Sequence, residues 1–414
     1  MGCCDTKGLM PLEDALTKLQ SSVTNVCESI TLPLSSALGF ALSENIKSPS
    51  NVPSFNNSAM DGYAVNIADF KSAKNQPITL KMVGKSFAGK PYTGELPPGC
   101  CIRIMTGAVL PSCADTVIMQ ERAQANNDLI TFSHVPKLGD NVRNAGEDIK
   151  QGETVLSIGH KLTPRDIPLI ASLGMHEVCV FRKLKVAVIS SGDELKNLGE
   201  TLQEGDIYDS NRYSIIALLS RLNVEIIDFG IIKDDLAAIS NAIKSADNQA
   251  DVVITSGGVS VGEADFIKEV LAELGEIGFW KLAIKPGKPF AFGKLPNSQF
   301  FGLPGNPVSA MVTLYQLAVP TMATMAGFNA KPAIRFNALT TDKLRKAAGR
   351  TDFQRAVYSV NKNGQLVVST TGSQGSGVFS SMSQSNCFIV LEQERGDVEI
   401  GETVTIEPYN ALMD

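Results

Sequence analysis

The feature that most constrains the fold is a regular alternation of strand and helix patterns between residues 184 and 326. Short apolar, β-branched runs at 184–190, 224–232 and 251–256 alternate with segments whose apolar residues recur at helical spacing. In the segment 211–222 these apolar residues are Ile215, Ile216, Leu218, Leu219 and Leu222. Strands that alternate with helices predict a parallel sheet with right-handed crossover connections.

An acid follows each of the three predicted strands. Glu194 comes after the first strand, Asp234 after the second and Asp265 after the third. A parallel sheet brings the carboxyl ends of its strands to one edge, where ligands bind, so we expect the three carboxylates to converge. The alternative is that Asp265 only caps a helix and that the other two are solvated turn residues.

Two glycine-rich segments follow predicted strands. The third strand runs directly into "SGGVSVGEADF" (256–266), and "GLPGNPVSAM" (302–311) leads into a helical pattern in which Asn306 suits the cap and Pro307 the first turn. Backbone N–H groups at such places bind anions, although glycine and proline also mark ordinary tight turns. The sequence contains no G-x-x-x-x-G-K-[ST], which excludes an ordinary nucleotide-cleaving P-loop.

Carboxylates beside an anion-binding loop require a cation. A carboxylate about 4 Å from a phosphate costs roughly 4 kcal/mol at an effective dielectric constant near 20, more than a helix end returns. A divalent ion held by Asp265, Glu194 or Asp234 and by phosphate oxygens would remove this conflict, and Lys285 and Lys288 supply further positive charge. The pattern predicts a pocket for a phosphorylated small molecule, with metal-assisted transfer or hydrolysis at phosphorus.

The remaining segments predict smaller units. Residues 11–28 carry Leu12, Ala15, Leu16 and Leu19 at helical spacing and predict a packing helix. Residues 48–152 alternate short apolar runs with Gly/Pro turns, which is typical of a small β-rich domain. After Pro332, several short strands with no helical stretch between them predict a β barrel or sandwich. Its Gly/Ser-rich loop contains Ser376, which either reaches a ligand or forms a mobile tip.

Composition excludes several classes of protein. With 43% apolar and 19% charged residues the chain is an ordinary globular protein, and its net charge of −6 is mixed along the sequence, which argues against nucleic-acid and membrane partners. No run of 18 apolar residues and no signal-peptide core occur, so we expect a cytoplasmic location. The eight cysteines contain no C-x-x-C and are expected to be reduced, and the three isolated histidines argue against a histidine metal site or a catalytic triad. The opening "MGCCDT" fits a myristoylation pattern, a short pattern that often occurs by chance.

Seven sequence strings carry a resemblance to a known family. They are "SAMDGYAV", "IRIMTGA", "GEDI", "SSGDEL", "ITSGGVSVGEADF", "KLAIKPGKPFAFG" and "GLPGNPVSA". In this order they resemble the MoeA family, the molybdopterin molybdenumtransferases of molybdenum cofactor synthesis, and the likeness extends over nearly the whole chain.

The resemblance implies a multidomain α/β plus β protein. We expect a parallel-sheet α/β domain of the molybdopterin-binding type, a β-rich linker domain, a small β-rich domain and a C-terminal β barrel. Their expected ranges are, in that order, 9–28 with 183–331, 29–47 with 153–182, 48–152, and 332–414.

The resemblance also implies an activity: adenylylated molybdopterin is bound at the parallel sheet, molybdate enters its dithiolene, and AMP is released with Mg²⁺ present. It implies an elongated homodimer in which one subunit's sheet domain faces the partner's β-rich domain, and an adenylyltransferase of the same pathway as a further partner. The implied catalytic residues are Asp61, Thr106 and Asp148 on the partner side, and Glu194, Asp234 and Asp265 on the sheet side, where the last three also hold the metal. The implied substrate-binding residues are Gly257, Gly258, Ser260, Lys281, Lys285, Pro304, Pro307 and Ser376.

Two alternative functions stay open at this point. A scaffold related to this family predicts a second glycine-loop domain and a long linker, and this sequence contains neither. A molybdopterin adenylyltransferase would use a similar sheet domain and ATP, but it would not need residues 48–152.

Overall fold

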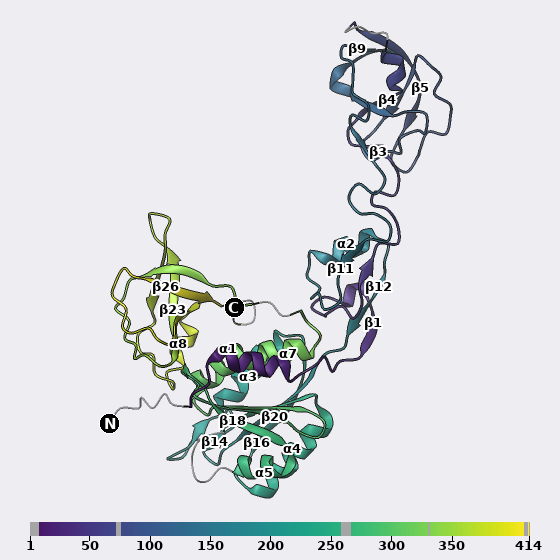
Figure 1. Cartoon of the computed structure of the whole chain (residues 1–414). Coiled ribbons are helices and arrows are strands. Elements are labelled where there is room, and N and C mark those ends of the chain that lie inside the picture. The colour runs from purple at the N-terminus through teal and green to yellow at the C-terminus, as the bar shows by residue number, and fades with distance from the viewer. Residues whose placement is uncertain (1–7, 72–75, 258–265, 330–331, 410–412, 414) are drawn as a thin grey trace.

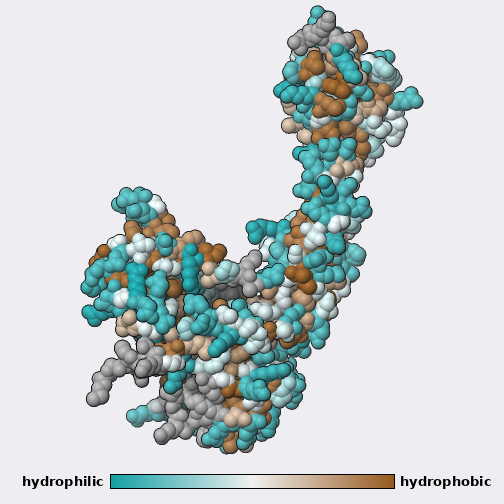
Figure 2. All heavy atoms as spheres, in the orientation of Figure 1, coloured by the Kyte–Doolittle hydropathy of each residue, from teal (hydrophilic) through white to brown (hydrophobic). Residues whose placement is uncertain are grey.

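The computed structural model describes residues 8–71, 76–257, 266–329, 332–409 and Met413, and in it the chain is elongated (Figure 1). An α/β unit and a β barrel form a broad body, from which an arm projects. The arm consists of a linker unit next to the body and a small β unit at the far tip, as the space-filling view also shows (Figure 2). The borders between these units, as drawn from the sequence, stay a prediction.

The α/β unit contains a six-stranded sheet in the order β16-β13-β17-β21-β20-β18. The first four strands are parallel. At the other edge β20 pairs antiparallel with β21, and β18 pairs antiparallel with β20, so the predicted parallel sheet is confirmed with a mixed edge. Their bounds are β13 (Lys185–Ser191), β16 (Glu225–Ile232), β17 (Val252–Ser256), β18 (Glu276–Lys281), β20 (Pro289–Lys294) and β21 (Gln299–Leu303).

Helices cover both faces of this sheet because alternate residues of each strand are apolar on opposite sides. Val186 and Val188 face one cluster, which is covered by α1 (Leu12–Ser21), α3 (Ser210–Ser220), α6 (Pro307–Thr313) and α7 (Val319–Met325). Ala187 and Ile189 face the other cluster, under α4 (Leu236–Gln249) and α5 (Phe266–Leu274). The helix predicted over 11–28 is shorter than expected, because the chain leaves it at Ser22 and turns toward the linker unit.

The described residues contain one helical stretch that is long and apolar enough to cross a membrane, Pro307–Met325. It consists of α6, a π-helical turn (Leu314–Ala318) and α7. Because 78% of this window is buried inside the protein, it is a core helix.

The C-terminal unit is a small barrel. Its strands are β22 (Phe336–Thr340), β23 (Thr351–Val360), β24 (Leu366–Thr370), β25 (Cys387–Leu391) and β26 (Thr403–Pro408), and β23 also pairs with β25 to close it. A short helix, α8 (Ser380–Ser383), interrupts the strands, so the expectation of no helical stretch was wrong. The α/β unit adds one short strand to this barrel, β19 (Ile284–Lys285), which runs parallel to β23.

The linker unit has a core formed by residues on either side of the small unit in the sequence. Its strands pair as β1 (Ser29–Pro33) with β12 (Glu177–Phe181) and β2 (Ile46–Lys47) with β11 (Thr154–Leu156). The short helices η1 (Leu34–Ser36) and α2 (Asp166–Ser172) complete it, and Leu42, Ile170 and Val180 are buried at its centre.

The small unit at the tip of the arm is a six-stranded sheet in the order β7-β4-β6-β5-β9-β8, with a separate pair β3-β10 at its base. The strands are β3 (Asn57–Ser58), β4 (Gly62–Val65), β5 (Ile78–Ser86), β6 (Cys100–Ile104), β7 (Thr116–Met119), β8 (Ala123–Asn126), β9 (Leu129–Phe132) and β10 (Val142–Arg143). A Cβ at Gly62 would lie 2.0 Å from the Ile118 carbonyl oxygen, so only glycine permits the close strand pairing that positions Asp61.

Candidate functional site

The predicted site residues of the α/β unit lie at one edge of its sheet. Strands β13, β16, β17 and β21 are parallel and therefore all end there. The connection from β18 to β20 returns to the same edge, because β20 runs antiparallel to β21 and begins beside its end. This edge thus carries two acidic segments, two glycine segments and a lysine-containing turn.

The acidic group consists of Asp193, Glu194 and Asp234. The Asp234 N–H donates a hydrogen bond to Asp193 Oδ1 at 3.2 Å, so the segments after β13 and β16 lie together. Asp234 lies at the surface, yet partial desolvation raises its pKa, and the nearby carboxylates of Asp193 and Glu194 raise it further. Within the described residues no lysine or arginine forms an ion pair with these three acids. Of the predicted acids, Asp265 lies outside the described residues.

A short excursion of the chain positions Glu194. The Glu194 carbonyl oxygen accepts a hydrogen bond from the Ile207 N–H at 2.8 Å, and the strands β14 (Leu195–Lys196) and β15 (Ile207–Tyr208) pair in parallel. A Cβ at Gly192 would lie 2.7 Å from Glu194 Oε2, so the carboxylate folds back over the backbone of its own turn.

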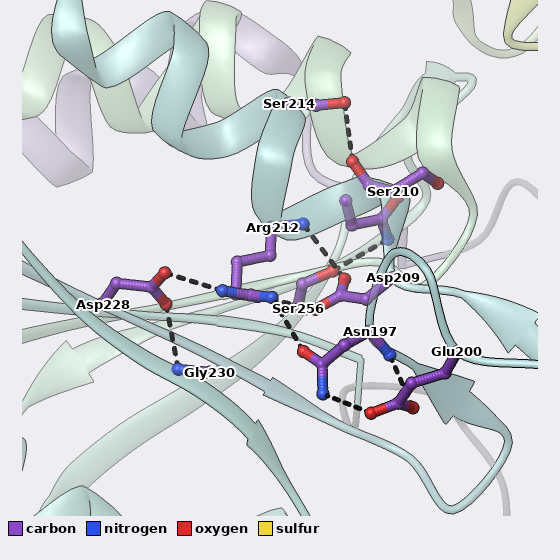
Figure 3. A network of polar contacts seen from close by, with 10 residues as sticks. Asn197, Glu200, Asp209, Ser210, Arg212, Ser214, Asp228, Gly230 and Ser256 are labelled. Atoms are coloured by element: carbon purple, nitrogen blue, oxygen red, sulfur yellow. Dashed lines mark hydrogen bonds and ion pairs between the residues drawn. The ribbon is translucent and has the colours of Figure 1, made fainter.

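A buried arginine ties this excursion to the sheet (Figure 3). Arg212, in the first turn of α3, donates to Asp209 Oδ2 at 2.9 Å, to Asp228 Oδ2 at 2.6 Å and to Asn197 Oδ1 at 3.3 Å. Its neighbour Asp209 is 1% exposed and caps α3 by accepting the Arg212 N–H. The predicted apolar face of this helix is confirmed, but sequence reasoning missed Arg212, because a charged residue at a helix start ordinarily faces solvent.

The two glycine segments meet through Asn211. Its Nδ2 donates to Ser256 Oγ and to the Gly305 carbonyl oxygen, both at 2.8 Å. The Gly257 N–H donates to the Leu303 carbonyl oxygen at 3.3 Å, which joins the ends of β17 and β21. Gly257 has φ +94°, and a Cβ there would lie 3.0 Å from the Ser191 carbonyl oxygen. The predicted residues Gly258 and Ser260 lie outside the described residues.

Buried polar atoms without a protein partner also occur at this edge. Asn211 Oδ1, Ser190 Oγ and Thr255 Oγ1 are buried and form no hydrogen bond with any residue that the structure describes. Because such atoms ordinarily find a partner, the edge has unused hydrogen-bonding capacity close to the glycine segments.

The start of α6 differs from the prediction. Asn306 occupies the cap position, but its side chain makes no capping hydrogen bond. The Val308 N–H donates instead to the Ser376 carbonyl oxygen at 3.1 Å, so the backbone of the barrel's Gly/Ser loop contacts the α/β unit. Pro307 occupies the first helical turn as expected, and Pro304 is buried just before it.

Two cations lie where the barrel meets the α/β unit. Lys285 Nζ is 3.3 Å from Asp352 Oδ2 of β23. Arg355, also in β23, is fully buried; its Nε donates to Ser381 Oγ and its Nη2 to the Gly375 carbonyl oxygen, both at 3.0 Å. No carboxylate among the described residues forms an ion pair with Arg355, and burial lowers its pKa. The predicted Lys281 is exposed at the end of β18.

Sequence reasoning missed Arg355 although a signal was present. In the strand pattern "TDFQRAV", side chains alternate between faces, so Arg355 shares the face of Phe353, which is buried in the core cluster of the α/β unit. A charged residue at an inward-facing strand position is rare unless it binds a partner or a ligand.

The residues expected from the partner side lie in the small unit. Thr106 donates twice to Asp61 Oδ1, from its backbone N–H and from its Oγ1, each at 2.8 Å. These two hydrogen bonds, the backbone one first, hold the pKa of Asp61 below its usual range. Asp148 is exposed in a loop near the base of the unit, where its N–H donates to the Val52 carbonyl oxygen. The small unit lies far from the α/β unit of the same chain, at the end of the arm (Figure 1).

A groove of about 600 Å³ lies between α3 and the barrel. Its walls include Tyr213, Met311, Met382 and Tyr409, and none of the predicted site residues lines it. The chemistry of phosphate binding suits the sheet edge, with acids at one end, glycine segments in the middle and cations at the other end.

Comparisons with known proteins agree with this architecture. Three family models match the chain in order: the MoeA N-terminal region (domain I and II) over 10–174, a probable molybdopterin binding domain over 187–324, and the MoeA C-terminal region (domain IV) over 337–409.

Two curated relatives and one solved structure cover most of the chain. A molybdopterin molybdenumtransferase of Haemophilus influenzae is 52% identical over 98% of this chain and 100% of its own length. One from Nostoc sp. is 33% identical over 89% of this chain and 86% of its own length. The crystal structure of the molybdopterin biosynthesis moeA protein from Pyrococcus horikoshii OT3 has a TM-score of 0.85 and 29% identity, and it covers 97% of this chain and 100% of its own.

Proposed function

This chain belongs to the MoeA family and is a molybdopterin molybdenumtransferase of molybdenum cofactor biosynthesis, and from this premise we propose that it inserts molybdate into adenylylated molybdopterin and releases AMP. The observation that supports this reaction is the separation of charge along the sheet edge. Asp193, Glu194 and Asp234 lie together without a pairing cation among the described residues, whereas Lys285 and Arg355 lie where the barrel meets the α/β unit.

The substrate bound at this edge carries an adenylate phosphate, which the glycine segments suit. Gly257 and Gly305 lie on adjoining strand ends, and their lack of side chains allows a ligand to approach the backbone. Asn211 holds the two segments at a fixed separation and keeps one unused acceptor, Oδ1, close to them. Pro304, Pro307, Ser376, Lys281 and, outside the described residues, Gly258 and Ser260 complete the proposed binding set.

Mg²⁺ fits the acidic end of the edge. Among the described residues, no group of three His, Cys, Asp or Glu side chains is arranged to hold a metal ion on its own. Mg²⁺ is usually held by one or two carboxylates together with substrate phosphates and water, a requirement that Glu194 and Asp234 meet, with Asp265 as a third proposed ligand. When bound, the ion would neutralise developing charge on the phosphate oxygens. The raised pKa of Asp234 agrees with this role, because a nearby cation would offset the partial desolvation and the repulsion by Asp193 and Glu194 that raise it.

Molybdate is an oxyanion, and the buried guanidinium of Arg355 adds positive charge beside the position that we propose for it. A fully buried guanidinium without a pairing carboxylate retains most of its positive potential, and Ser381 and the Gly375 carbonyl oxygen hold it in place. The Gly/Ser loop that bonds Arg355 also contacts the start of α6 through Ser376, so this oxyanion position adjoins the second glycine segment.

We propose that the site is completed by a second copy of the chain in a homodimer. Asp61 and Thr106 form a preorganised acid at the tip of the arm, and no other predicted site residue except Asp148 lies in that unit. Exposed apolar side chains flank both ends of the proposed contact. Near Glu194 these are Leu198, Leu202, Ile207 and Tyr208, and near Asp61 they are Phe55 and Met60. Contact between these two groups would remove apolar surface from water.

The location and the pathway partner are also proposals. A cytoplasmic enzyme would receive adenylylated molybdopterin directly from the adenylyltransferase that makes it.

The decisive experiment is an assay of AMP release by the purified chain from adenylylated molybdopterin, with and without molybdate. We expect release that depends on molybdate and on a divalent ion, with formation of molybdenum cofactor. Cleavage of ATP to pyrophosphate on addition of molybdopterin would instead identify an adenylyltransferase.

A further inference from the structure

The connection between Lys285 and the C-terminal barrel carries an inference that rests on the proposed function. The strand β19 (Ile284–Lys285) belongs to the α/β unit in sequence but pairs with β23 of the barrel, with Ile284 beside Thr351 and Lys285 beside Asp352. A backbone hydrogen bond of 2.8 Å from the Thr351 N–H to the Ala283 carbonyl oxygen adds to this pairing. The backbone that carries Lys285 is therefore shared between two units.

The side chains repeat this arrangement. Lys285 Nζ donates to Asp352 Oδ2 at 3.3 Å, and the Asp352 side chain is 5% exposed whereas that of Lys285 is 45% exposed. Asp352 is itself fixed, because Gln354 Nε2 donates to the same Oδ2 at 3.2 Å and to the Arg345 carbonyl oxygen at 3.2 Å. A rigid, buried carboxylate thus holds a partly exposed ammonium group.

We propose that Asp352 is a positioning residue, which holds the Lys285 ammonium at the sheet edge so that its other N–H groups face the phosphate of the bound substrate. An ammonium has three N–H donors, and one hydrogen bond to Asp352 leaves two for an anion. Without this contact the long lysine side chain would have to be ordered when substrate binds, at a cost in rotamer entropy. The barrel therefore acts on substrate affinity through one ion pair.

The test is a double-mutant cycle on the full-length enzyme, with KM for adenylylated molybdopterin and kcat measured separately from molybdate-dependent AMP release. We expect Lys285→Met to raise KM by about tenfold, with a smaller effect on kcat, because a charge-assisted hydrogen bond is lost. In an Asp352→Asn background, where the lysine is no longer held by a charge, the same change should raise KM by no more than about threefold.

A matched control uses another buried acid of the barrel. Glu407 is 1% exposed, bonds Gln316 and Arg335, and has no contact with Lys285. In a Glu407→Gln background the penalty of Lys285→Met should stay at about tenfold, since only general stability of the barrel is changed. Equal penalties in the wild-type and Asp352→Asn backgrounds would overturn the positioning role and leave the proposed function intact. No penalty in the wild type would instead contradict the phosphate-binding role of Lys285.

A second variant keeps Asp352 unchanged in case Asp352→Asn does not fold. Lys285→Arg keeps the positive charge but moves it onto a longer, planar group that does not reproduce the position of the ammonium. We expect the KM of Lys285→Arg to be lower than that of Lys285→Met by less than about threefold. Full recovery would show that charge alone matters and would overturn the proposal.

Discussion

Asp61 and Asp234 are the same residue type, and their surroundings move their pKa values in opposite directions. Two hydrogen bonds from Thr106 stabilise the charged form of Asp61 and lower its pKa. Partial desolvation and two neighbouring carboxylates destabilise the charged form of Asp234 and raise its pKa. The surroundings of Asp61 thus favour its ionised form, whereas those of Asp234 disfavour it, and a bound cation would offset this effect at Asp234.

The first prediction concerns Thr106. Thr106→Val removes the hydroxyl donor and keeps the backbone donor, so the pKa of Asp61 should rise part of the way toward its ordinary value. Because the pKa of Asp61 is lowered, its ionised form stabilises the folded protein. This stabilisation is present above the ordinary aspartate pKa and is lost as the pH falls through the lowered pKa of Asp61. The acid limb of the pH–activity profile should therefore move to higher pH. At neutral pH Asp61 stays ionised, and AMP release should fall about tenfold there because the carboxylate loses one of the two hydrogen bonds that orient it.

Carbon NMR titration of the Asp61 carboxyl group measures this shift directly. Thr79→Val is the matched control, because its hydroxyl bonds Thr131 in the same sheet and not an acid. An Asp61 titration curve that is unchanged in Thr106→Val would contradict the prediction.

The second prediction concerns Asp234 in the absence of metal. Because its pKa is raised, its favourable contribution to stability is present below the ordinary aspartate pKa and is lost as the pH rises through the raised value. At pH 7 and without Mg²⁺, Asp234→Asn should therefore raise Tm by about 1–2 °C. The same change should abolish the increase in Tm that Mg²⁺ causes in the wild type.

Asp235, next to Asp234, provides the control, and calorimetry measures Tm for both variants with and without Mg²⁺. Asp235 caps α4 by accepting the Ala238 N–H, and asparagine caps helices about as well as aspartate. Asp235→Asn should leave both Tm and the response to Mg²⁺ unchanged. A full Mg²⁺ response in Asp234→Asn would remove Asp234 from the metal site.

At the scale of elements, the edge of the sheet depends on backbone contacts between strand ends. Strands β13, β17 and β21 end side by side, and the first residue after β17 contacts both neighbours. Gly257 lies against Ser191 on one side and its N–H donates to the Leu303 carbonyl oxygen on the other. A Cβ at Gly257 would come close to the Ser191 carbonyl oxygen, so glycine at this position suits the close approach of β13 and β17 and leaves the backbone open to a ligand.

A third prediction follows for Gly257→Ala. The new Cβ would lie 3.0 Å from the Ser191 carbonyl oxygen in a residue with φ +94°. We expect a loss of about 1–3 kcal/mol in the free energy of unfolding from backbone strain, and about a tenfold weaker binding of adenylylated molybdopterin because the strand ends must separate.

Gly199→Ala separates these two effects. Gly199 has a similar φ of +88°, but a Cβ there meets no atom within 4 Å. It should lose stability from the backbone conformation and keep normal substrate binding in calorimetry. Equal binding by the two variants would show that the contact with Ser191 has no role in the site.

At the scale of the whole molecule, the arm separates the two halves of the proposed site. The linker unit is built from two chain segments that enclose the small unit in sequence, and its core around Leu42, Ile170 and Val180 fixes the base of the arm. The small unit therefore lies far from the α/β unit of its own chain (Figures 1 and 2). This separation supports the proposal that the acid of the small unit acts at the sheet edge of another copy of the chain.

The fourth prediction tests this geometry with mixed dimers. Asp61→Asn and Asp234→Asn homodimers should both be inactive, because every site lacks one acid. In a mixed dimer one site carries both changes and the other carries none, and random reassortment makes half of the dimers mixed. Co-refolding should therefore restore roughly a quarter of wild-type AMP release.

The control mixes two variants of the same side. Asp234→Asn with Glu194→Gln leaves every site with one change, so no activity should return. If Asp61 instead acted within its own chain, the first mixture would also stay inactive, and verified heterodimers without activity would contradict the composite site.

The sequence by itself determined the parallel sheet, the small β-rich unit and the barrel, because strand and helix patterns arise from apolar residues close together in the chain. It also predicted that Glu194 and Asp234 approach each other, since the carboxyl ends of parallel strands share an edge whatever the other contacts are. Asp265, the acid predicted to follow the third strand, lies outside the described residues and stays a prediction.

Only the tertiary structure decided the burial and the partners of charged groups. The burial of Arg212 and Arg355 depends on Asp228, Ser381 and Gly375, each 15 or more residues distant in sequence. Lys285 was expected to face a phosphate, and the pairing of β19 with β23 also gives it Asp352 as a partner 67 residues away. Hydrophobic periodicity is local and readable from a short window, whereas the energy of a charge depends on every group that packs around it, and these groups come together only when the chain folds.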